Sequence, residues 1–244
     1  MTTHVMSTPH IAFPSELVAG RLIQRRMRFL ADVRLESDET LTAHVPNSGA
    51  MLGVKDPGTK VWLSESDNPN RKLKHTLEMV QIDGTLIGVN TSHPNAIVSA
   101  AIERQDIPEL DHYHTLKREV KYGAENSRID LVLERDDRPP CFVEVKNVHL
   151  SRDTGLAEFP DSVTTRGAKH MRELAAEAEA GNRAVVMFVV QRGDCDRFQV
   201  AKDIDPGYYE ALTTAVKQGV EVLCYGCDMS RQGIRLGKPL IVTL

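Results

Sequence analysis

The sequence predicts a two-domain α/β (α+β) protein, with a small N-terminal β-barrel over residues 1–90 and a mixed sheet flanked by helices over residues 91–244. Before Asn90, short apolar segments alternate with turn residues, and no segment has the periodicity of an amphipathic helix. After Asn90, helical segments that begin at capping residues alternate with apolar strands. That order is typical of a sheet covered by helices.

The predicted barrel consists of strands that turn residues separate. The turns lie at Ser37-Asp38, Pro57-Gly58 and Asp83-Gly84, and the last is a strong hairpin signal because these residue types accept positive φ values. Five short strands within about 75 residues favour a Greek-key barrel of the OB type. We expect these strands, the first of them bent, at 22–33, 41–45, 60–63, 77–82 and 86–89.

The second predicted domain begins with a helix and then alternates. Ser92 as the capping residue and Pro94 in the first turn predict a helix that ends near Arg104. Two strands follow at 128–133 and 141–148, joined by a turn rich in Asp and Pro. The continuous apolar run at 184–190 predicts a strand covered on both faces. We expect the remaining elements to be helices at 164–180 and 206–218, a strand at 220–225 and an edge strand at 239–244.

Two acids and a lysine are predicted to meet on the strands at 128–133 and 141–148. Side chains alternate faces along a strand, so Glu144 and Lys146 emerge on the same side. A hairpin places Asp130 about 5 Å away on the adjacent strand. Carboxylates at the edge of an apolar sheet are unfavourable unless their charge is compensated, and a divalent metal bound to both would do so. We therefore expect Mg²⁺ or Mn²⁺ at Asp130 and Glu144, and a site that cleaves phosphodiesters.

Neighbouring residues complete this predicted site. The backbone carbonyl of Val145 is a candidate metal ligand, because it lies between Glu144 and Lys146. Lys146 would orient the attacking water or meet the developing negative charge. Glu119, just before the first of the two strands, would add a ligand or hold a metal-bound water. The alternative is a solvated ion pair, since Glu-x-Lys strands are common and such pairs contribute little.

Basic and polar residues outside these strands predict a surface for a nucleic-acid backbone. Barrels of this type often guide such a backbone across a basic face. The loop after the strand at 41–45 offers amide and hydroxyl donors, and the helix at 164–180 carries a basic face. A merely solvated charged surface is the alternative. The predicted nucleic-acid contacts are Arg21, Arg25, Arg26, Arg28, Asn47, Ser48, Arg166, Lys169 and His170.

Composition limits the class of protein and of partner. The 244 residues are 41% hydrophobic and 26% charged, as in an ordinary globular protein. The 30 Lys and Arg against 34 Asp and Glu give a net charge of −4, so a nucleic-acid surface must be a local patch. The first 16 residues lack a signal-peptide core and no apolar run reaches ~18 residues, so we expect a cytoplasmic protein without membrane contact. The four cysteines predict buried thiols, with a redox or zinc site at Cys224 and Cys227 as the alternative.

Several long segments, in one order along the chain, resemble the sugar fermentation stimulation protein A (SfsA) family. They are RRMRFLAD at 25–32, HVPNSG at 44–49, YGAENSRID at 122–130, EVKNV at 144–148 and FPDSVTTRGAKH at 159–170. The resemblance implies an OB-like domain followed by a PD-(D/E)xK nuclease-like domain, with Asp130, Glu144 and Lys146 at the positions of the nuclease motif. It also implies DNA binding without sequence preference and a link to regulation of sugar use, including maltose.

Two functions compete at this point. The first is a DNA-binding protein with Mg²⁺-dependent phosphodiesterase chemistry; the second is a DNA-binding regulator that keeps the nuclease scaffold without cleaving. A sugar-binding or metabolic enzyme is disfavoured, because Trp62 is the sole tryptophan and no phosphate-cradling glycine motif is present. The sequence leaves open the form of the nucleic acid and the oligomeric state, with a homodimer among the alternatives.

Overall fold

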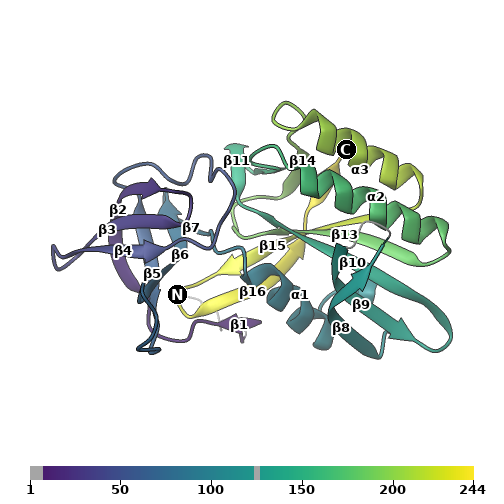
Figure 1. The fold of residues 1–244 in the computed structure, drawn as a ribbon, viewed down its shortest axis with the longest axis horizontal. Helices are drawn as coiled ribbons and strands as arrows, with labels where there is room; N and C mark the ends of the chain where they lie inside the picture. The colour runs from purple at the N-terminus through teal and green to yellow at the C-terminus, as the bar shows by residue number, and fades with distance from the viewer. Residues whose placement is uncertain (1–7, 124–126) are drawn as a thin grey trace, which may run out of the picture.

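The computed structural model of the protein describes residues 8–123 and 127–244. A small barrel and a larger domain of sheets and helices lie side by side along the long axis of the molecule (Figure 1). This confirms the predicted two-domain architecture. One strand departs from the predicted division by sequence: β1 (Ile11–Ala12) precedes the barrel but pairs with β16 (Gly233–Pro239) in the larger domain.

The barrel is closed by five strands. A sheet of order β4-β3-β2-β5-β6-β7 closes where His44 of β4 pairs with Thr76 of β6, so β7 lies outside the ring. The bent strand predicted at 22–33 is wrong, because Met27, Arg28 and Phe29 form the tip of a hairpin between two strands. The strands are β2 (Val18–Arg26), β3 (Leu30–Leu35), β4 (Thr40–His44), β5 (Lys60–Glu65), β6 (His75–Ile82) and β7 (Thr85–Gly88).

The larger domain is organised around a seven-stranded mixed sheet. Its central strand β13 (Arg183–Val190) is parallel to β10 (Arg138–Val148) on one side and to β15 (Glu221–Met229) on the other. Residues 184–190 of β13 are all buried, as their apolar run predicts. Across the sheet the order is β1, β16, β15, β13, β10, β9 (Ser127–Arg135) and β8 (Thr115–Tyr122).

A second, four-stranded sheet lies at the edge of this domain. It consists of β11 (Leu150–Asp153), β12 (Leu156–Phe159), β14 (Arg197–Val200) and β17 (Ile241–Thr243). Only β17 lies within a strand that the sequence predicts. The other three strands have four residues each, too few to show a pattern of alternation.

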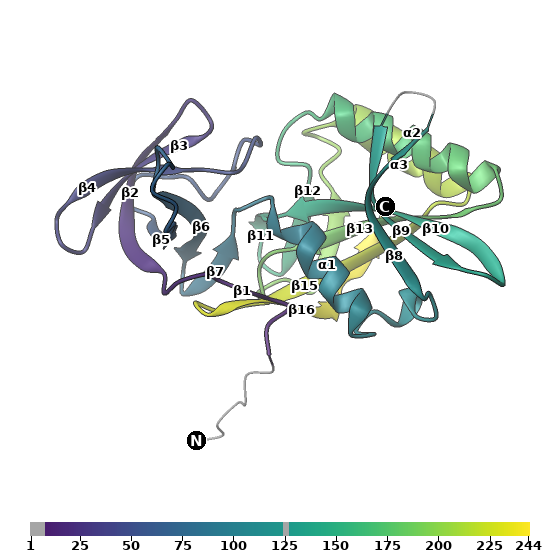
Figure 2. The ribbon, with the colours of Figure 1, turned by 60° about the horizontal axis from the view of Figure 1, so that its bottom comes forward.

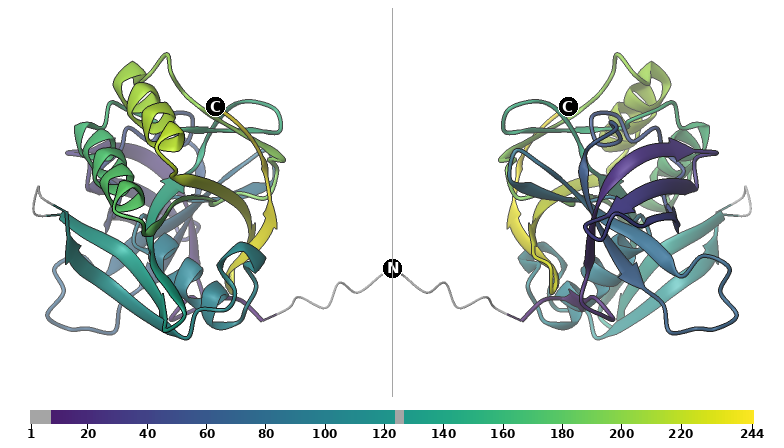
Figure 3. Two further views of the ribbon diagram at one scale, coloured as in Figure 1. Left: turned by 90° about the vertical axis from the view of Figure 1, so that its right-hand side faces the viewer. Right: turned by 90° about the vertical axis from the view of Figure 1, so that its left-hand side faces the viewer.

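Three helices cover the main sheet on opposite faces. Helices α2 (Thr165–Glu179) and α3 (Pro206–Lys217) pack side by side over one face, and α1 (His93–Glu103) covers the other (Figures 1 and 3). A short 3₁₀ turn, Pro108–Leu110, follows α1. The Thr164 hydroxyl accepts a hydrogen bond from the Gly167 amide at 3.0 Å, which confirms the predicted start of α2. Ser92 makes no such cap at α1, since its hydroxyl donates to Asn90 Oδ1 at 2.6 Å instead.

The two domains share buried polar contacts at their junction. Gln191, which follows β13, accepts a 2.8 Å hydrogen bond from the Gly88 amide through its backbone carbonyl. Its side-chain amide donates to the carbonyl of Asn90 at 3.1 Å. A Cβ atom at Gly88 would lie 2.5 Å from Gln191 Oε1, so only glycine permits this close approach.

Two further predictions concern the cysteines and the membrane. All four cysteines are buried free thiols, and burial raises the pKa of Cys141 to about 12. Over the described ranges, no helix is long and apolar enough to cross a membrane.

Candidate functional site

The candidate site begins where β9 and β10 separate. The two strands pair in antiparallel register as far as Leu131 opposite Val143. Beyond that pair, the acceptor of the Val145 amide is a side chain in place of a backbone carbonyl of β9. Asp130 Oδ2 accepts this hydrogen bond at 2.7 Å. The carboxylate of Asp130 therefore lies in the gap between the strands, where the charges of Glu144 and Lys146 act on it.

Glu144 and Lys146 lie on the same side of β10 and contact each other. Lys146 Nζ donates to Glu144 Oε1 at 2.7 Å, and His170 of α2 contacts the same oxygen through Nδ1. Arg166 Nε donates to His170 Nε2 at 3.3 Å, so the imidazole that fits both contacts carries its proton on Nδ1. The side chains of Glu144 and Lys146 are only 3% and 11% exposed. This is a recessed, polar arrangement under the start of α2.

The two carboxylates have opposite electrostatic environments. Burial and the negative charge of Glu144 raise the pKa of Asp130 to about 6. Burial alone would also raise the pKa of Glu144, but Lys146 and His170 outweigh burial and lower it. Glu144 is thus held ionised beside an acid whose own ionisation it opposes, which leaves negative charge to be compensated.

Asn95, in the first turn of α1, holds the outer side of the site. Its side-chain amide donates to Asp130 Oδ1 at 2.8 Å and lies 3.5 Å from Glu119 Oε1. Glu119 was expected to precede the first of the two strands but lies inside β8, directly across from Asp130 in the register that pairs Arg118 with Leu131. Its backbone φ is 53°, in the left-handed region. Glu119 is therefore an exposed acid at the rim of the site.

The donors of the site fit a hard divalent cation. Glu144 Oε2 is buried and has no hydrogen-bond partner among the described residues. The N–H and the carbonyl of a residue in a strand face the same neighbour, so the carbonyl of Val145 is expected to face the gap that holds Asp130. No group of three or more His, Cys, Asp or Glu in the described part of the chain is arranged to hold a metal. Two carboxylates and a carbonyl match Mg²⁺, which keeps several waters and needs few protein ligands.

A cleft of about 610 Å³ between the domains adjoins this site. The barrel contributes Arg28, Asn47 and Ser48 to its lining, and the loop before α2 contributes residues 160–164 together with Arg166. Asn147, the residue after Lys146, also lines it. This interdomain cleft therefore runs from the barrel to the end of β10. Figure 2 shows the two domains that bound it.

Of the residues predicted to contact nucleic acid on α2, Arg166 lines the interdomain cleft, whereas Lys169 and His170 do not. Arg166 is exposed, and His170 is buried against Glu144. Lys169 is half-buried on the turn between them. Of these three residues, Arg166 is therefore the one whose charged group is open to the cleft.

On the barrel side, the predicted contacts divide into scaffold and surface. All three nitrogens of the Arg25 guanidinium donate to backbone carbonyls, namely those of Arg28 (2.8 Å), Gly49 (3.0 Å) and Asn47 (2.6 Å). The Asn47 side chain is buried and donates to the carbonyl of Val89 at 2.9 Å. Arg25 and Asn47 thus shape the wall, whereas Arg28 and Ser48 are exposed on it.

Arg21 and Arg26 lie farther along β2 and do not line the interdomain cleft. Arg26 is paired with Asp32 through two hydrogen bonds of 2.9 and 3.1 Å, which holds the pKa of Asp32 well below its usual value. Arg21 is exposed and donates to the carbonyl of Gly58 at 3.0 Å. The exposed cation of this hairpin that faces the cleft is Arg28.

Asp161, on the loop before α2, fastens the larger domain to the barrel. Its Oδ2 accepts a 2.6 Å hydrogen bond from the amide of Met51 and lies 3.3 Å from His149 Nε2. Burial opposes the ionisation of Asp161, but its contacts with His149 and the barrel backbone outweigh it and lower the pKa. An ionised Asp161 therefore links the loop before α2 to the backbone of the barrel.

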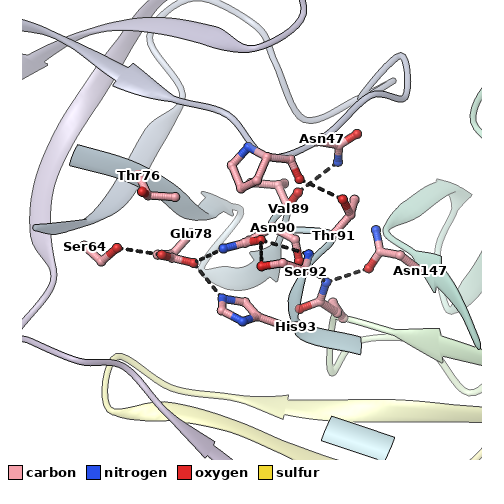
Figure 4. A network of polar contacts seen from close by, with 12 residues as sticks. Asn47, Ser64, Thr76, Glu78, Val89, Asn90, Thr91, Ser92, His93 and Asn147 are labelled. Carbon is pink, nitrogen blue, oxygen red and sulfur yellow. Dashed lines mark hydrogen bonds and ion pairs between the residues drawn. The ribbon is translucent and has the colours of Figure 1, made fainter. Parts of the chain in front are cut away.

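A buried polar network links the barrel to the helix that carries Asn95 (Figure 4). Glu78 of β6 accepts hydrogen bonds from the hydroxyl of Ser64 at 2.6 Å and from the side-chain amide of Asn90 at 2.7 Å. The first residue of α1, His93, places Nε2 2.7 Å from Glu78 Oε2, the oxygen that also accepts from Asn90. The barrel thus fixes where α1 begins, and α1 in turn fixes Asn95.

The network also reaches the strand that carries Lys146. Gln191 Nε2 lies 2.5 Å from Asn147 Oδ1 as well as 3.1 Å from the carbonyl of Asn90. Both ends of the candidate site are consequently tied to the domain junction.

Sequence reasoning missed Asn95, Asp161 and the scaffold role of Arg25. A lone Asn in a first helical turn carries no sign of a partner 35 positions away. Asp161 lies within the resembling segment at 159–170, and no other feature of the sequence points to a role for it. Only the packing of the domains shows what these side chains contact.

Comparisons with known proteins agree with both halves of the fold. Residues 23–89 match the family model described as the SfsA N-terminal OB domain, and residues 92–233 match the sugar fermentation stimulation protein RE domain. A sugar fermentation stimulation protein homolog of Maricaulis maris is 54% identical over 95% of this chain and 98% of its own length. One from Rhodospirillum centenum is 56% identical over 93% of this chain and 97% of its own.

A solved structure is similar over both domains. The structure of Pyrococcus furiosus SfsA in complex with Ca²⁺ has a TM-score of 0.88 and 26% sequence identity, and the match covers 98% of this chain and 100% of that one.

Proposed function

The chain belongs to the sugar fermentation stimulation protein family, and on this premise we propose that it is a sequence-nonspecific DNA-binding protein with a Mg²⁺- or Mn²⁺-dependent phosphodiesterase site. The observation that carries the proposal is the meeting of Asp130, Glu144 and Lys146 where β9 and β10 separate, beside a cleft lined by Arg28 and Arg166. The Ca²⁺ bound by the Pyrococcus furiosus protein supports a divalent cation in this fold. We expect any effect on sugar use to follow from DNA binding in the cytoplasm.

Each residue of the site has a defined task in this proposal. Asp130, Glu144 and the carbonyl of Val145 would hold the cation. The bound cation would offset negative charge on a phosphate oxygen and lower the pKa of a bound water. The ammonium of Lys146 is placed by Glu144 to orient a water or to meet the charge that develops on the phosphate. Arg166 supplies a fork of donors that suits a phosphate, and Glu119 is an exposed acid near the metal ligands.

A non-catalytic DNA-binding regulator is the second candidate. The observation that favours it is the closed set of contacts among Glu144, Lys146 and His170, which compensates one carboxylate without a metal. These contacts would keep the domain folded whether or not the protein cleaves DNA.

Cleavage of a labelled oligonucleotide in Mn²⁺, with EDTA as the reference, tests the proposal. We expect cleavage by the natural protein, and a loss of about a hundredfold or more in Glu144→Gln and Lys146→Ala. The control is Glu134→Gln, which removes an exposed acid from the same strand as Asp130 and should leave the rate unchanged. DNA binding without Mn²⁺-dependent cleavage would favour the regulator, and equal cleavage by all three variants would reject the site.

A further inference from the structure

The rims of the interdomain cleft carry an unusual set of exposed apolar side chains. In the described part of the chain five large hydrophobic side chains are exposed, and three of them lie here: Met27 (74%), Phe29 (48%) and Val163 (69%). Met27 and Phe29 flank Arg28, which lines the cleft from the barrel, and Val163 lines it from the loop before α2. The apolar surface is therefore gathered at a place that also carries cations.

The barrel rim is held rigidly in a strained conformation. Met27 and Arg28 have φ values of 50° and 62°, in the left-handed region that residues with a side chain rarely adopt. Arg25 fixes this tip, because Arg25 Nε donates to the carbonyl of Arg28 while its other nitrogens bind the loop at Asn47 and Gly49. Strain that the surrounding structure maintains is common at ligand-binding sites. The tip thus presents Phe29 and Arg28 to solvent in a fixed arrangement.

The acids in the interdomain cleft do not oppose an anionic chain. Glu158 is buried and held by Arg152 through hydrogen bonds of 2.7 and 2.8 Å. Asp161 is engaged by the amide of Met51 and by His149. Arg28 has no ion pair or hydrogen bond from its side chain to any described residue, so its charge is available to a ligand.

From these observations we infer that the interdomain cleft binds single-stranded DNA, with an unpaired base stacked on Phe29. The inference rests on the proposed function and specifies its substrate. Aromatic side chains stack on bases only when the bases are unpaired, and Arg28 of the barrel and Arg166 of α2 both line the cleft, where they can bind phosphates. A duplex hides its base faces, and its backbone cannot reach a carboxylate as recessed as that of Glu144 unless a strand separates.

Fluorescence anisotropy with the full chain tests the inference. The probes are a labelled DNA strand of about 15 nucleotides, its blunt duplex, and an RNA strand of the same sequence, all in EDTA so that nothing is cleaved. We expect the DNA strand to bind at least about tenfold more tightly than the duplex. Phe29→Ala should weaken binding of the strand by about five- to a hundredfold and leave the duplex unchanged.

Two further variants control for surface apolarity and for folding. Phe29→Tyr keeps the ring and should bind the strand as the natural protein does. Ile241→Ala removes a more exposed apolar side chain (70%, against 48% for Phe29) from β17 of the larger domain, and should have no effect. Strand binding unaffected by Phe29→Ala, a duplex bound as tightly as the strand, or a preference for RNA would each overturn the inference. The proposed function would survive the first two results, provided that Mn²⁺-dependent cleavage is observed.

Discussion

Asp130 is the residue at which stability and the proposed chemistry oppose each other. Its carboxylate is half-buried next to Glu144, and burial together with that charge raises its pKa to about 6, so folding shifts Asp130 toward its neutral form. The folded state therefore binds more protons than the unfolded chain between about pH 4 and pH 6, so Asp130 lowers stability progressively as the pH rises through that window.

Asp130→Asn should consequently raise the free energy of unfolding of the metal-free protein near neutral pH. We expect about 1–3 kcal/mol, or about 2–8 °C in the melting temperature, because the charge repelled by Glu144 is gone. The gain should shrink as the pH is lowered toward 4. Thermal melts from pH 4 to 8 measure it, with Glu134→Gln as the control on the same strand. A lower melting temperature for Asp130→Asn at neutral pH would contradict the prediction.

Asn95 is a positioning residue that acts through Asp130. Its replacement by alanine removes the 2.8 Å donor to Oδ1 but leaves the Val145 amide on Oδ2. We expect Asn95→Ala to weaken Mn²⁺ binding by about ten- to a hundredfold, which is typical when a group that orients a ligand is lost. Titration calorimetry measures the Mn²⁺ affinity, and an unchanged melting temperature shows that the variant is folded. Asn68→Ala, in an exposed turn, serves as the control. Unchanged affinity would mean that Asp130 is oriented without α1.

At the scale of elements, the two-residue strand β1 depends on a buried histidine. His10 Nδ1 accepts a 2.8 Å hydrogen bond from the Leu236 amide, so Nε2 carries the proton and donates to Asp106 at 2.8 Å. Burial lowers the pKa of His10 below 6.5 despite the partly compensating contact with Asp106. The stability that His10 contributes is present above pH 6.5 and is lost as the pH falls below that value.

We therefore expect β1 to detach from β16 in mild acid before the rest of the sheet responds. Protonation of Nδ1 removes the acceptor of the Leu236 amide, so hydrogen exchange corrected for intrinsic rate should accelerate at residues 234–236 as the pH falls below 6.5. His114→Gln, which changes an exposed histidine, should exchange like the natural protein. Equal protection of β16 at pH 5 and pH 7.5 would exclude this response.

The elements also show what the sequence could and could not predict. Strands and helices with long patterns, such as residues 184–190 and the helix capped by Thr164, were predicted correctly because burial and capping leave local signals. The hairpin at Met27-Arg28-Phe29 was mistaken for a bent strand, since it contains none of the Gly, Asn or Asp that mark tight turns.

The candidate site divides in the same way. Glu144 and Lys146 lie on the same face because side chains alternate along a strand. Their spacing within one segment was therefore enough to predict that they meet. The place of Glu119 across from Asp130 depends on β8, whose charged residues conceal its alternation. The contacts of Asn95 and Asp161 join distant segments and carry no local pattern.

For the whole molecule, Asp161 is a carboxylate that contacts the barrel from the larger domain at the cleft. Asp161→Ala would leave the amide of Met51 without its acceptor and His149 without its charged partner. We expect a loss of about 2–4 kcal/mol, since a hydrogen bond to a buried charge is broken at a domain junction. Scanning calorimetry should show the single transition of the natural protein broaden or divide into two. A single, unshifted transition would show that the other junction contacts suffice.

Binding to DNA should report the same cleft through its dependence on salt. Phosphate contacts release counterions, so the logarithm of the affinity should fall linearly with the logarithm of the salt concentration. Arg28→Ala and Arg166→Ala should each lower that slope by about one, because both guanidinium groups line the cleft. Arg26→Ala should change it little, since Arg26 is already neutralised by Asp32. An affinity that does not change with salt would exclude backbone contacts.

The close contact of Gly88 with Gln191 across the domain junction limits which domains can be exchanged between homologues. A hybrid that joins this barrel to the second half of a homologue would retain the tight fit only if that half supplies a long amide at the same place. A shorter apolar residue there would leave the carbonyl of Asn90 without its donor, and any larger residue in place of Gly88 would collide with Gln191. Exchange of halves is therefore expected to succeed when these two positions are inherited together.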